Sequence, residues 1–362
     1  MSTGDPLEPL RQRIDELDGQ LVRLLNERAE VVVEIGRLKR DGGHAPIYAP
    51  DREQRVLQKV RDANNGPLPD GCLEAIWREL MSGSFALERK LRIGFLGPLG
   101  SFSHLAATKQ FGACVDYEPV ESITGVFHAV EASKADLGLV PIENSIGGGI
   151  HETLDSFLDS SARVCAEVNI PIHHHVLSKN SADEIKRVYS RPEVFEQCRR
   201  WLSEHLRGAE RMATTSSARA AQLAVEEDGS AAIGSELAAD VYNLPKVFEC
   251  IEDNPNNVTR FFVIGHQAAR PTGDDKTAIL FTTEHKPGAL AAVMDALRDN
   301  GVNLTHIDKR PSQRVNWEYS FFIDCEGHID EPKVADALAS ARKHCLQLTV
   351  LGSFPRAKKA IV

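Results

Sequence analysis

The sequence predicts a chain of three domains, an all-α domain followed by an α/β domain and an α+β domain. Three observations support this prediction. Residues 1–90 carry only helical patterns. In residues 91–268, short apolar stretches alternate with helical stretches, which is the order expected of an α/β domain. Residues 276–362 follow the order strand, helix, strand, strand, helix, strand, which is typical of a ferredoxin-like fold.

The all-α domain is organised around one long helix, expected over residues 10–39. Counted in heptads from Leu7, nine of the ten a and d positions are apolar, which indicates a packed helical seam. The tenth is Arg28, and a guanidinium in such a seam is costly unless an anion meets it. Two interpretations remain open. Either Arg28 extends out of a coiled coil to solvent, or the helices hold an anionic small molecule.

A second arginine on the same helix bears on the assembly. Arg11 and Arg28 are 17 residues apart, which is about 25 Å on a straight helix. One small ligand cannot easily reach both residues. If both bind ligands, Arg11 serves a second site supplied mostly by another copy of the chain, which favours an intertwined helical dimer.

The remaining elements follow from apolar periodicity and turn residues. A second helix is expected to open at residues 49–53 and end near Ala63, and a third to cover 70–87. In the α/β domain, strands are expected at residues 91–96, 137–142, 164–172, 187–190, 231–234 and 260–264. A polar linker over 268–275 leads into the last domain, with strands expected at 277–283, 302–309, 317–325 and 346–351 and helices at 288–300 and 331–343.

The composition limits the partners and the compartment. The chain of 362 residues has a net charge of −10, so a general nucleic-acid partner is not expected. No apolar stretch has membrane-spanning length, and the N-terminus lacks a signal-peptide pattern. The seven cysteines are scattered and form no CxxC pair, which favours a reduced, cytoplasmic compartment.

Neither a metal nor an organic cofactor is expected. The glycines of residues 94–100 are spaced GxxGxxG, which differs from the GxGxxG of dinucleotide-binding sites. Residues 173–175 are three consecutive histidines. Neighbouring residues of a strand point to opposite faces, so three in a row rarely bind one ion.

Three groups of residues occur in an order that points to one family. The helices carry a set of cations. The α/β domain carries GPLGSF at 97–102, VPIENS at 140–145 and NVTRF at 257–261, and the last domain carries KPGAL at 286–290 and DKRP at 308–311. In this order they resemble the bifunctional chorismate mutase–prephenate dehydratases, which have a C-terminal ACT domain. The resemblance covers nearly the whole chain.

The resemblance implies that chorismate rearranges to prephenate in the helical domain. This reaction needs no nucleophile or cofactor, because the site has only to hold a dianion in a compact conformer. Lys39 and Glu88 are expected to donate to the ether oxygen, which gains negative charge, and Glu53 is expected to hold the ring hydroxyl. The expected chorismate-binding residues are Arg11, Arg28, Lys39, Arg52, Glu53, Ser84 and Glu88.

Two positions depart from the pattern of the mutases. Ala49 stands where family members commonly carry Asp, and Glu88 stands where they commonly carry Gln. Ala49 can offer only its backbone. Glu88 can donate a hydrogen bond only when its carboxyl group is protonated.

In the α/β domain the resemblance implies two lobes with a cleft between them, where prephenate loses water and carbon dioxide to give phenylpyruvate. Thr259 is the family's essential hydroxyl, expected to donate a hydrogen bond or to relay a proton. Glu143 is a further candidate acid. The expected prephenate-binding residues are Asn144, Ser145, Ser190, Gln197, Thr259, Arg260 and Phe261.

In the last domain the resemblance implies phenylalanine sensing. Pro287 and Gly288 open a helix whose free amide groups suit an amino-acid carboxylate. Asp308 and Lys309 replace the Glu and Ser of the family's ESRP motif, so we expect inhibition that survives with altered, weaker affinity. The expected phenylalanine-binding residues are Gly288, Ala289, Leu290, Asp308, Lys309, Arg310 and Pro311.

We therefore expect a bifunctional, phenylalanine-inhibited enzyme of phenylalanine biosynthesis that forms a homodimer or a higher homo-oligomer. Two alternatives remain open. In the first, only the dehydratase is active and the helical domain is a dimerisation module, for which Ala49 is the sequence support. In the second, the chain is an amino-acid sensor with impaired enzyme domains, against which the complete TRF motif and the cation set argue.

Overall fold

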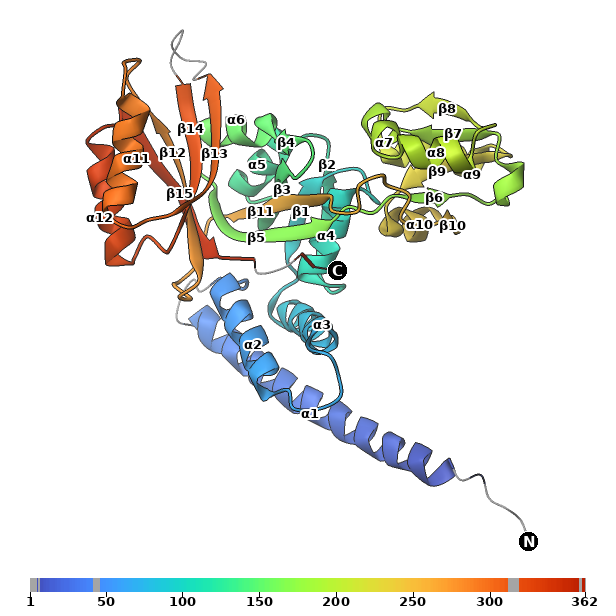
Figure 1. The fold of residues 1–362 in the computed structure, drawn as a ribbon. Helices are drawn as coiled ribbons and strands as arrows, with labels where there is room; N and C mark the ends of the chain where they lie inside the picture. The colour runs from blue at the N-terminus through green and yellow to red at the C-terminus, as the bar shows by residue number, and fades with distance from the viewer. Residues whose placement is uncertain (1–4, 6, 42–45, 312–318, 358–359, 362) are drawn as a thin grey trace.

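The computed structural model describes residues 5, 7–41, 46–311, 319–357 and 360–361. An all-α domain projects from an α/β body, and an α+β domain packs against another side of that body (Figure 1). The three predicted fold classes are confirmed in their predicted order. In the described part of the chain, none of the helices combines the length and the apolar character needed to cross a membrane.

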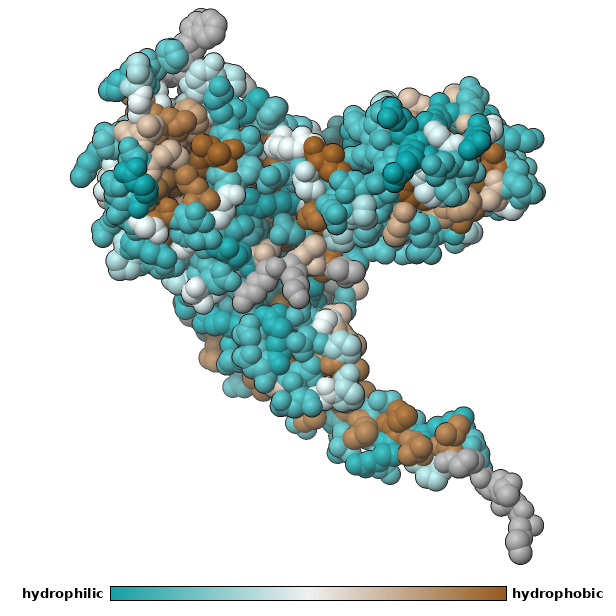
Figure 2. Space-filling view, viewed as in Figure 1, coloured by the Kyte–Doolittle hydropathy of each residue, from teal (hydrophilic) through white to brown (hydrophobic). Residues whose placement is uncertain are grey.

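The all-α domain has three helices, α1 (Glu8–Asp41), α2 (Pro50–Ala63) and α3 (Asp70–Glu88). The long helix α1 extends far beyond the other two helices, of which α3 packs on α1 and α2 packs on α3 (Figure 1). Its apolar seam is therefore open in the single chain, with Leu10 63% and Leu24 61% exposed. Apolar side chains gather on the outer part of α1 in Figure 2.

The first lobe of the α/β domain contains one sheet with strand order β2-β1-β3-β11-β5, and β4 pairs with β3. The strands β1 to β3 are parallel, whereas β11 runs antiparallel to both its neighbours. The strands are β1 (Arg92–Leu96), β2 (Asp116–Val120), β3 (Leu137–Asn144), β4 (Gly148–Gly149), β5 (Arg163–Pro171) and β11 (Val258–Gly265). The helices are α4 (Phe102–Phe111), α5 (Ile123–Glu131) and α6 (His151–Asp159).

The second lobe has its own sheet, with strand order β10-β6-β9-β7-β8. Its strands are β6 (His175–Leu177), β7 (Arg187–Ser190), β8 (Glu210–Ala213), β9 (Ser230–Gly234) and β10 (Lys246–Phe248). Its helices are η1 (Ala182–Glu184), α7 (Pro192–Gln197), α8 (Arg199–His205), α9 (Ser217–Glu226) and α10 (Glu236–Tyr242). The chain crosses between the lobes twice, at residues 172–174 and 249–257, and backbone hydrogen bonds join the two crossovers. The expectation of two lobes is confirmed.

The last domain is a four-stranded antiparallel sheet, order β13-β14-β12-β15, with two helices packed against it (Figure 1). Its order βαββαβ is the predicted one. The elements are β12 (Asp275–Thr282), α11 (Ala289–Asp299), β13 (Leu304–Pro311), β14 (Tyr319–Glu326), α12 (Pro332–Arg342) and β15 (Gln347–Pro355). The expected beginning of the third strand, residues 317–318, lies outside the described residues.

The α/β domain and the last domain share one hydrophobic core. Phe322 and Phe354 of the last domain pack against Phe262 of β11, with ring centroids 6.2 and 5.3 Å apart. Strand β15 passes so close to β5 that a Cβ atom at Gly352 would lie 2.0 Å from the Val164 carbonyl oxygen. The boundary between these domains in the sequence is thus not a boundary in packing.

Candidate active and regulatory sites

The helical domain brings several cations close together. The Arg28 guanidinium donates to Ser84 Oγ at 2.9 Å, and Lys39 Nζ lies 3.1 and 3.2 Å from the two carboxylate oxygens of Glu88. Burial and, to a smaller extent, the charge of Arg52 lower the pKa of Arg28, so two guanidinium groups repel each other here. Such a group of charges is suited to a dianion.

Glycine allows this packing between α1 and α3. A Cβ atom at Gly36 would lie 3.0 Å from Glu88 Cγ, so a larger residue would push Glu88 away from Lys39. The ion pair between Lys39 and Glu88 needs an ionised carboxylate, which cannot donate to an ether oxygen. In this structure Lys39 is therefore the donor of the pair.

Two members of the expected chorismate-binding set lie elsewhere. Arg11 is near the free end of α1, where it pairs with Asp5 at 2.7 Å. Glu53 faces the α/β domain and accepts hydrogen bonds from Gln110 at 3.2 Å. Burial raises the pKa of Glu53 to about 7, against the opposing effect of Arg78. The single chain thus assembles part of the expected set and leaves these two residues apart from it.

The end of the β3–β11 pairing carries a hydrogen-bonded group built on Asn144. This residue faces Thr259 across the pairing of β3 with β11. Its amide nitrogen donates to Thr259 Oγ1 at 2.9 Å and to Asn257 Oδ1 at 2.8 Å, and its amide oxygen accepts from the backbone of Ile146 and Gly147. Because Thr259 Oγ1 is an acceptor in this contact, its hydroxyl hydrogen is available to a ligand.

Buried polar atoms without a partner occur in the second lobe and in the two crossovers. Within the described residues, Ser190 Oγ, Asn257 Nδ2 and His174 Nδ1 are buried and make no hydrogen bond. The other ring nitrogen of His174 lies 2.7 Å from Gln197 Oε1, and burial lowers the pKa of His174, which favours the neutral ring. Unsatisfied buried groups are costly, so atoms of this kind indicate a place where a polar ligand binds.

His174 and Asn257 were not among the expected site residues. Asn257 lies in the motif at 257–261, two residues before Thr259. In an extended chain, residues two apart face the same side, so this spacing was a usable signal. His174 was considered only as part of a metal site. Nothing in the sequence indicated that its ring meets Gln197, because His174 lies in the first crossover and Gln197 at the end of α7.

Other expected prephenate-binding residues have different contacts. Ser145 Oγ accepts from the Val258 backbone at 2.9 Å, which ties β11 to the end of β3. Phe261 is buried in the core beneath the cleft. Arg260 points to the opposite face of β11 from Thr259, because neighbouring residues of a strand alternate, and it pairs there with Glu167 and Asp324. The expectation that Arg260 contacts prephenate is therefore not supported by its position.

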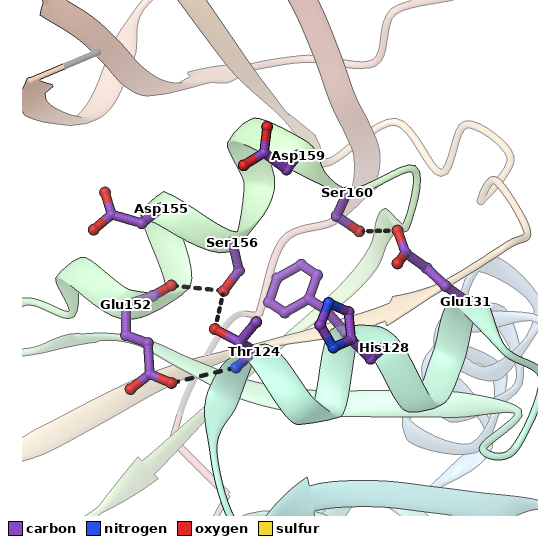
Figure 3. Close-up of a pocket in the computed structure, with 9 residues that line it drawn as sticks. Thr124, His128, Glu131, Glu152, Asp155, Ser156, Asp159 and Ser160 are labelled. Carbon is purple, nitrogen blue, oxygen red and sulfur yellow. Dashed lines mark hydrogen bonds between the residues drawn. The ribbon is translucent and has the colours of Figure 1, made fainter. Parts of the chain in front are cut away.

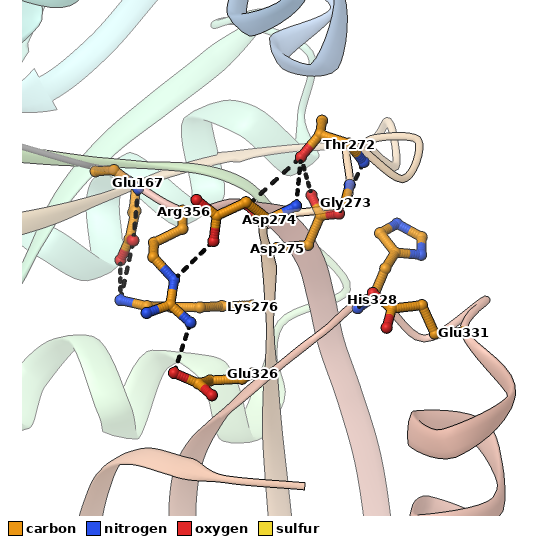
Figure 4. A network of polar contacts seen from close by, with 11 residues as sticks. Glu167, Thr272, Gly273, Asp274, Asp275, Lys276, Glu326, His328, Glu331 and Arg356 are labelled. Atoms are coloured by element: carbon orange, nitrogen blue, oxygen red, sulfur yellow. Dashed lines mark hydrogen bonds and ion pairs between the residues drawn. The ribbon is translucent and has the colours of Figure 1, made fainter.

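Arg260 belongs to an ion network between the α/β domain and the last domain. Its guanidinium lies 2.7 Å from Glu167 of β5 and 2.5 Å from Asp324 of β14, and it is only 11% exposed. Lys276 pairs with the same Glu167 at 3.0 Å. Figure 4 shows the adjoining part of this network, in which Arg356 links Asp274 and Glu326.

Glu143 takes part in a second link between these domains. His306 of β13 lies 3.2 Å from its carboxylate. The hydrogen bond from His306 lowers the pKa of Glu143, and this bond raises the pKa of His306 although burial opposes it. Glu143 is thus held ionised, which is unsuited to the role of proton donor that its sequence position suggested.

The expected phenylalanine-binding residues fall into two groups. Gly288, with φ 81°, precedes helix α11, and Ala289 and Leu290 line a small cavity of about 130 Å³ with Tyr319 and Phe321. Lys309 joins this group, because its Nζ lies 4.5 Å from the centre of the Tyr319 ring.

The second group faces the α/β domain. Arg310 forms two hydrogen bonds with Asp155 of α6, at 2.8 and 2.6 Å, and Asp308 accepts from His306 at 3.0 Å. Pro311 is exposed at the end of β13. Within one chain, part of the expected motif at 308–311 thus connects the last domain to the α/β domain.

A larger cavity is lined in part by Asp155, the partner of Arg310. It has a volume of about 480 Å³ and lies between α5 and α6 (Figure 3). Its carboxylates have structural partners: Glu131 accepts from Ser160 at 2.7 Å, and Asp155 pairs with Arg310. We assign no ligand to this cavity.

These features define a class of protein: a multidomain enzyme for small anions that carries a ligand-binding domain at its C-terminus. The sequence matches the family models for chorismate mutase type II over residues 10–89, prephenate dehydratase over 93–269 and the ACT domain over 277–343. It is 43% identical to a bifunctional chorismate mutase/prephenate dehydratase of Pseudomonas aeruginosa, covering 99% of this chain and 100% of the relative. The corresponding protein of Escherichia coli K12 is 31% identical, over 98% and 97% of the two chains.

A solved structure agrees with these matches. The prephenate dehydratase from Arthrobacter aurescens in complex with L-Phe is 35% identical, with a TM-score of 0.70 over 75% of this chain and 92% of that one. The chain belongs to the bifunctional chorismate mutase/prephenate dehydratase family.

Proposed function

We propose that the chain converts chorismate to prephenate in its helical domain and prephenate to phenylpyruvate in its two-lobed domain, under inhibition by phenylalanine. The observation that carries this proposal is the placement of Thr259, whose oxygen is fixed by Asn144 while its hydrogen is left for a ligand. We place this activity in the cytoplasm, as the scattered, unpaired cysteines led us to expect.

In the mutase reaction the protein acts by holding one conformer. Arg28 and Arg52 bind the two carboxylates of chorismate, which removes the repulsion between the guanidinium groups. Lys39 donates to the ether oxygen as its bond to carbon breaks and negative charge develops. The rearrangement is intramolecular, so no group is transferred to the protein.

In the dehydratase reaction, loss of carbon dioxide supplies the electron pair that completes the aromatic ring and expels hydroxide. Thr259 donates its hydrogen bond to the departing oxygen, which takes up a proton from solvent and leaves as water. Asn257 and Ser190 offer buried polar atoms to the rest of the substrate. The neutral His174 keeps Gln197 in place beside them.

The active assembly is a dimer joined along α1. The exposed leucines of this helix form an apolar face of the kind that a second helix covers. An α1 from a second copy would also bring its Arg11 to a mutase site that contains Arg28 of the first copy. This arrangement completes the cation set that one chain leaves divided.

The dimer has a direct test. Arg11→Ala and Arg28→Ala chains should each lack mutase activity, whereas a mixture of the two should recover part of it. In a mixed dimer one site carries both changes and the other carries neither. If subunit exchange is demonstrated and no activity returns, the shared site is excluded.

Phenylalanine is expected to bind at the Gly288–Leu290 segment, in a pair of ACT domains. Support comes from the solved relative, which was obtained in complex with L-Phe. The ion pairs of Arg260 and His306 give this domain contact with both strands of the cleft. Binding that favours one arrangement of the domains would thereby change the dehydratase.

The overall proposal is tested by incubating the pure protein with chorismate and following prephenate and phenylpyruvate, with and without phenylalanine. The Thr259→Ala variant should accumulate prephenate while chorismate disappears at the normal rate. Failure of the wild type to consume chorismate would favour the alternative in which only the dehydratase is active. Failure to convert either substrate, with phenylalanine still bound, would favour a sensor with impaired enzyme domains.

A further inference from the structure

The two crossovers between the lobes carry three side chains that the proposed reactions do not use. His173 lies in the first crossover, and Cys250 and Glu252 lie in the second. The crossovers run side by side, since the Ile251 amide donates to the His174 carbonyl at 2.8 Å. These side chains therefore meet where the two crossovers join the lobes.

The three side chains converge closely enough to bind one ion. A ring nitrogen of His173, Cys250 Sγ and a carboxylate oxygen of Glu252 all lie within 4.8 Å of one another. Within the residues that the structure describes, this is the one group of three such side chains that meets this distance. Ligands around a tetrahedral zinc ion, each about 2.0 to 2.3 Å from the metal, are separated by comparable distances.

The surroundings suit an ion that keeps one solvent ligand. Glu252 has a side chain only 2% exposed, and its second oxygen accepts from the His174 backbone at 2.9 Å. The His173 ring is 37% exposed, and Cys250 is exposed. The group is thus anchored on one side by a fixed carboxylate and open on the other side to water.

The backbone at Cys250 is unusual. Its φ is 52°, in the left-handed region that residues other than glycine rarely adopt. Conformations of this kind gather at functional sites. An ion pair between His173 and Glu252, 2.7 Å apart, would account for those two residues alone and gives no role to a thiol held beside them.

We propose that His173, Cys250 and Glu252 bind a zinc ion at the hinge of the dehydratase domain, with water as the fourth ligand. A thiolate, an imidazole and a carboxylate are ligands that zinc takes in proteins. On binding, the ion replaces the thiol proton, which is released to solvent, and the hydrogen bond between His173 and Glu252. Because one ligand comes from the first crossover and two from the second, the ion would restrict movement of the lobes.

The proposal revises the expectation that no metal binds. That expectation considered the three consecutive histidines alone. The three histidines do have separate contacts, since His173 lies against Glu252 and His174 against Gln197. The other two ligands come from a segment more than 70 residues further along the chain, so no metal-binding spacing could be recognised in the sequence.

The test uses the full chain, reduced and freed of metal with a chelator. Zinc is titrated in competition with a chromophoric chelator, and cobalt is added separately as a spectroscopic substitute. We expect one zinc per chain and, with cobalt, the near-ultraviolet absorption of a thiolate ligand. Supporting partners of metal ligands contribute about tenfold to a hundredfold in affinity, so Cys250→Ser and His173→Gln should each weaken zinc binding by more than this.

Cys72→Ser is the matched control, because Cys72 is an exposed cysteine of α3 far from the hinge. It should bind zinc as the wild type does. Zinc binding of equal strength in Cys250→Ser, or cobalt binding to the wild type without thiolate absorption, would overturn the proposal. These readouts do not depend on either enzymatic activity.

Discussion

Replacing Glu53 by glutamine should stabilise the protein at alkaline pH and change little in acid. Burial raises the pKa of this carboxyl group from 4.5 to about 7. A raised carboxyl pKa means that the folded state disfavours the ionised form, so the destabilisation is absent below pH 4.5, grows between 4.5 and 7, and is complete above 7. The difference between these two pKa values corresponds to at most about 3.4 kcal/mol of unfolding free energy.

The glutamine is a close replacement, because its amide oxygen can still accept the hydrogen bond of Gln110. Thermal unfolding of wild type and Glu53→Gln should be followed at pH 5 and pH 8.5, using the transition of the helical domain. The three-domain chain is not a two-state system, so the melting temperature of this transition is compared. For a domain of this size about 1 kcal/mol shifts it by roughly 4–8 °C.

We expect a clear gain at pH 8.5 and a gain several times smaller at pH 5. A melting temperature that differs by the same amount at both pH values would refute the reasoning, because the effect would then not come from ionisation. Gln54→Glu is not a suitable reverse control, since its amide oxygen is itself buried without a partner. Asp62→Asn makes the same change from carboxylate to amide at an exposed end of α2, and serves as the matched control that should show no such pH-dependent gain.

The remaining predictions address the sites and the domain interface. Glu88→Gln should raise the mutase rate at neutral pH by about tenfold, because an amide can donate a hydrogen bond where a carboxylate cannot, and because Lys39 is freed from its ion pair. An unchanged initial rate would show that Glu88 does not act in the mutase site. Arg260→Met should destabilise the protein by about 3–5 kcal/mol, since it leaves two buried carboxylates facing each other. Adding Asp324→Asn to this variant should restore part of the lost stability, as measured by thermal unfolding. Gly288→Val should abolish phenylalanine binding in calorimetric titration, because φ 81° excludes a branched residue; undiminished binding would place the site elsewhere.

The sequence predicted the long elements well because their patterns extend over many residues. The heptads of α1 and the apolar runs of the central strands are of this kind. Short strands at the sheet edges were not predicted, since β2 has a mostly exposed, polar sequence and β10 has three residues. Their pairing depends on partners distant in the chain, which local patterns do not reveal.

The ends of the central strands mattered most for the site. The expected strands stopped at 142 and began at 260, whereas β3 continues to Asn144 and β11 begins at Val258. These additional residues pair Asn144 with Thr259. The resemblance brought both residues into the expected site, but only their register shows that one orients the other.

The role of Arg260 could not be read from its motif. Its partners, Glu167 and Asp324, come from two other domain segments and carry no signal of their own in the sequence. Nor could the division of the chorismate-binding set be seen, beyond the separation of Arg11 from Arg28. Glu53 is separated from the rest of the set because the face of α2 that carries it meets the α/β domain.

The shared core of the α/β and ACT domains limits how this enzyme can lose its regulation. A chain shortened after β11 would uncover Phe262 and the face of β5 on which β15 rests, and would leave Arg260 without Asp324. Such a chain would expose a broad apolar surface and tend to aggregate. Strains selected to overproduce phenylalanine should therefore carry point substitutions in the ACT domain rather than stop codons before it.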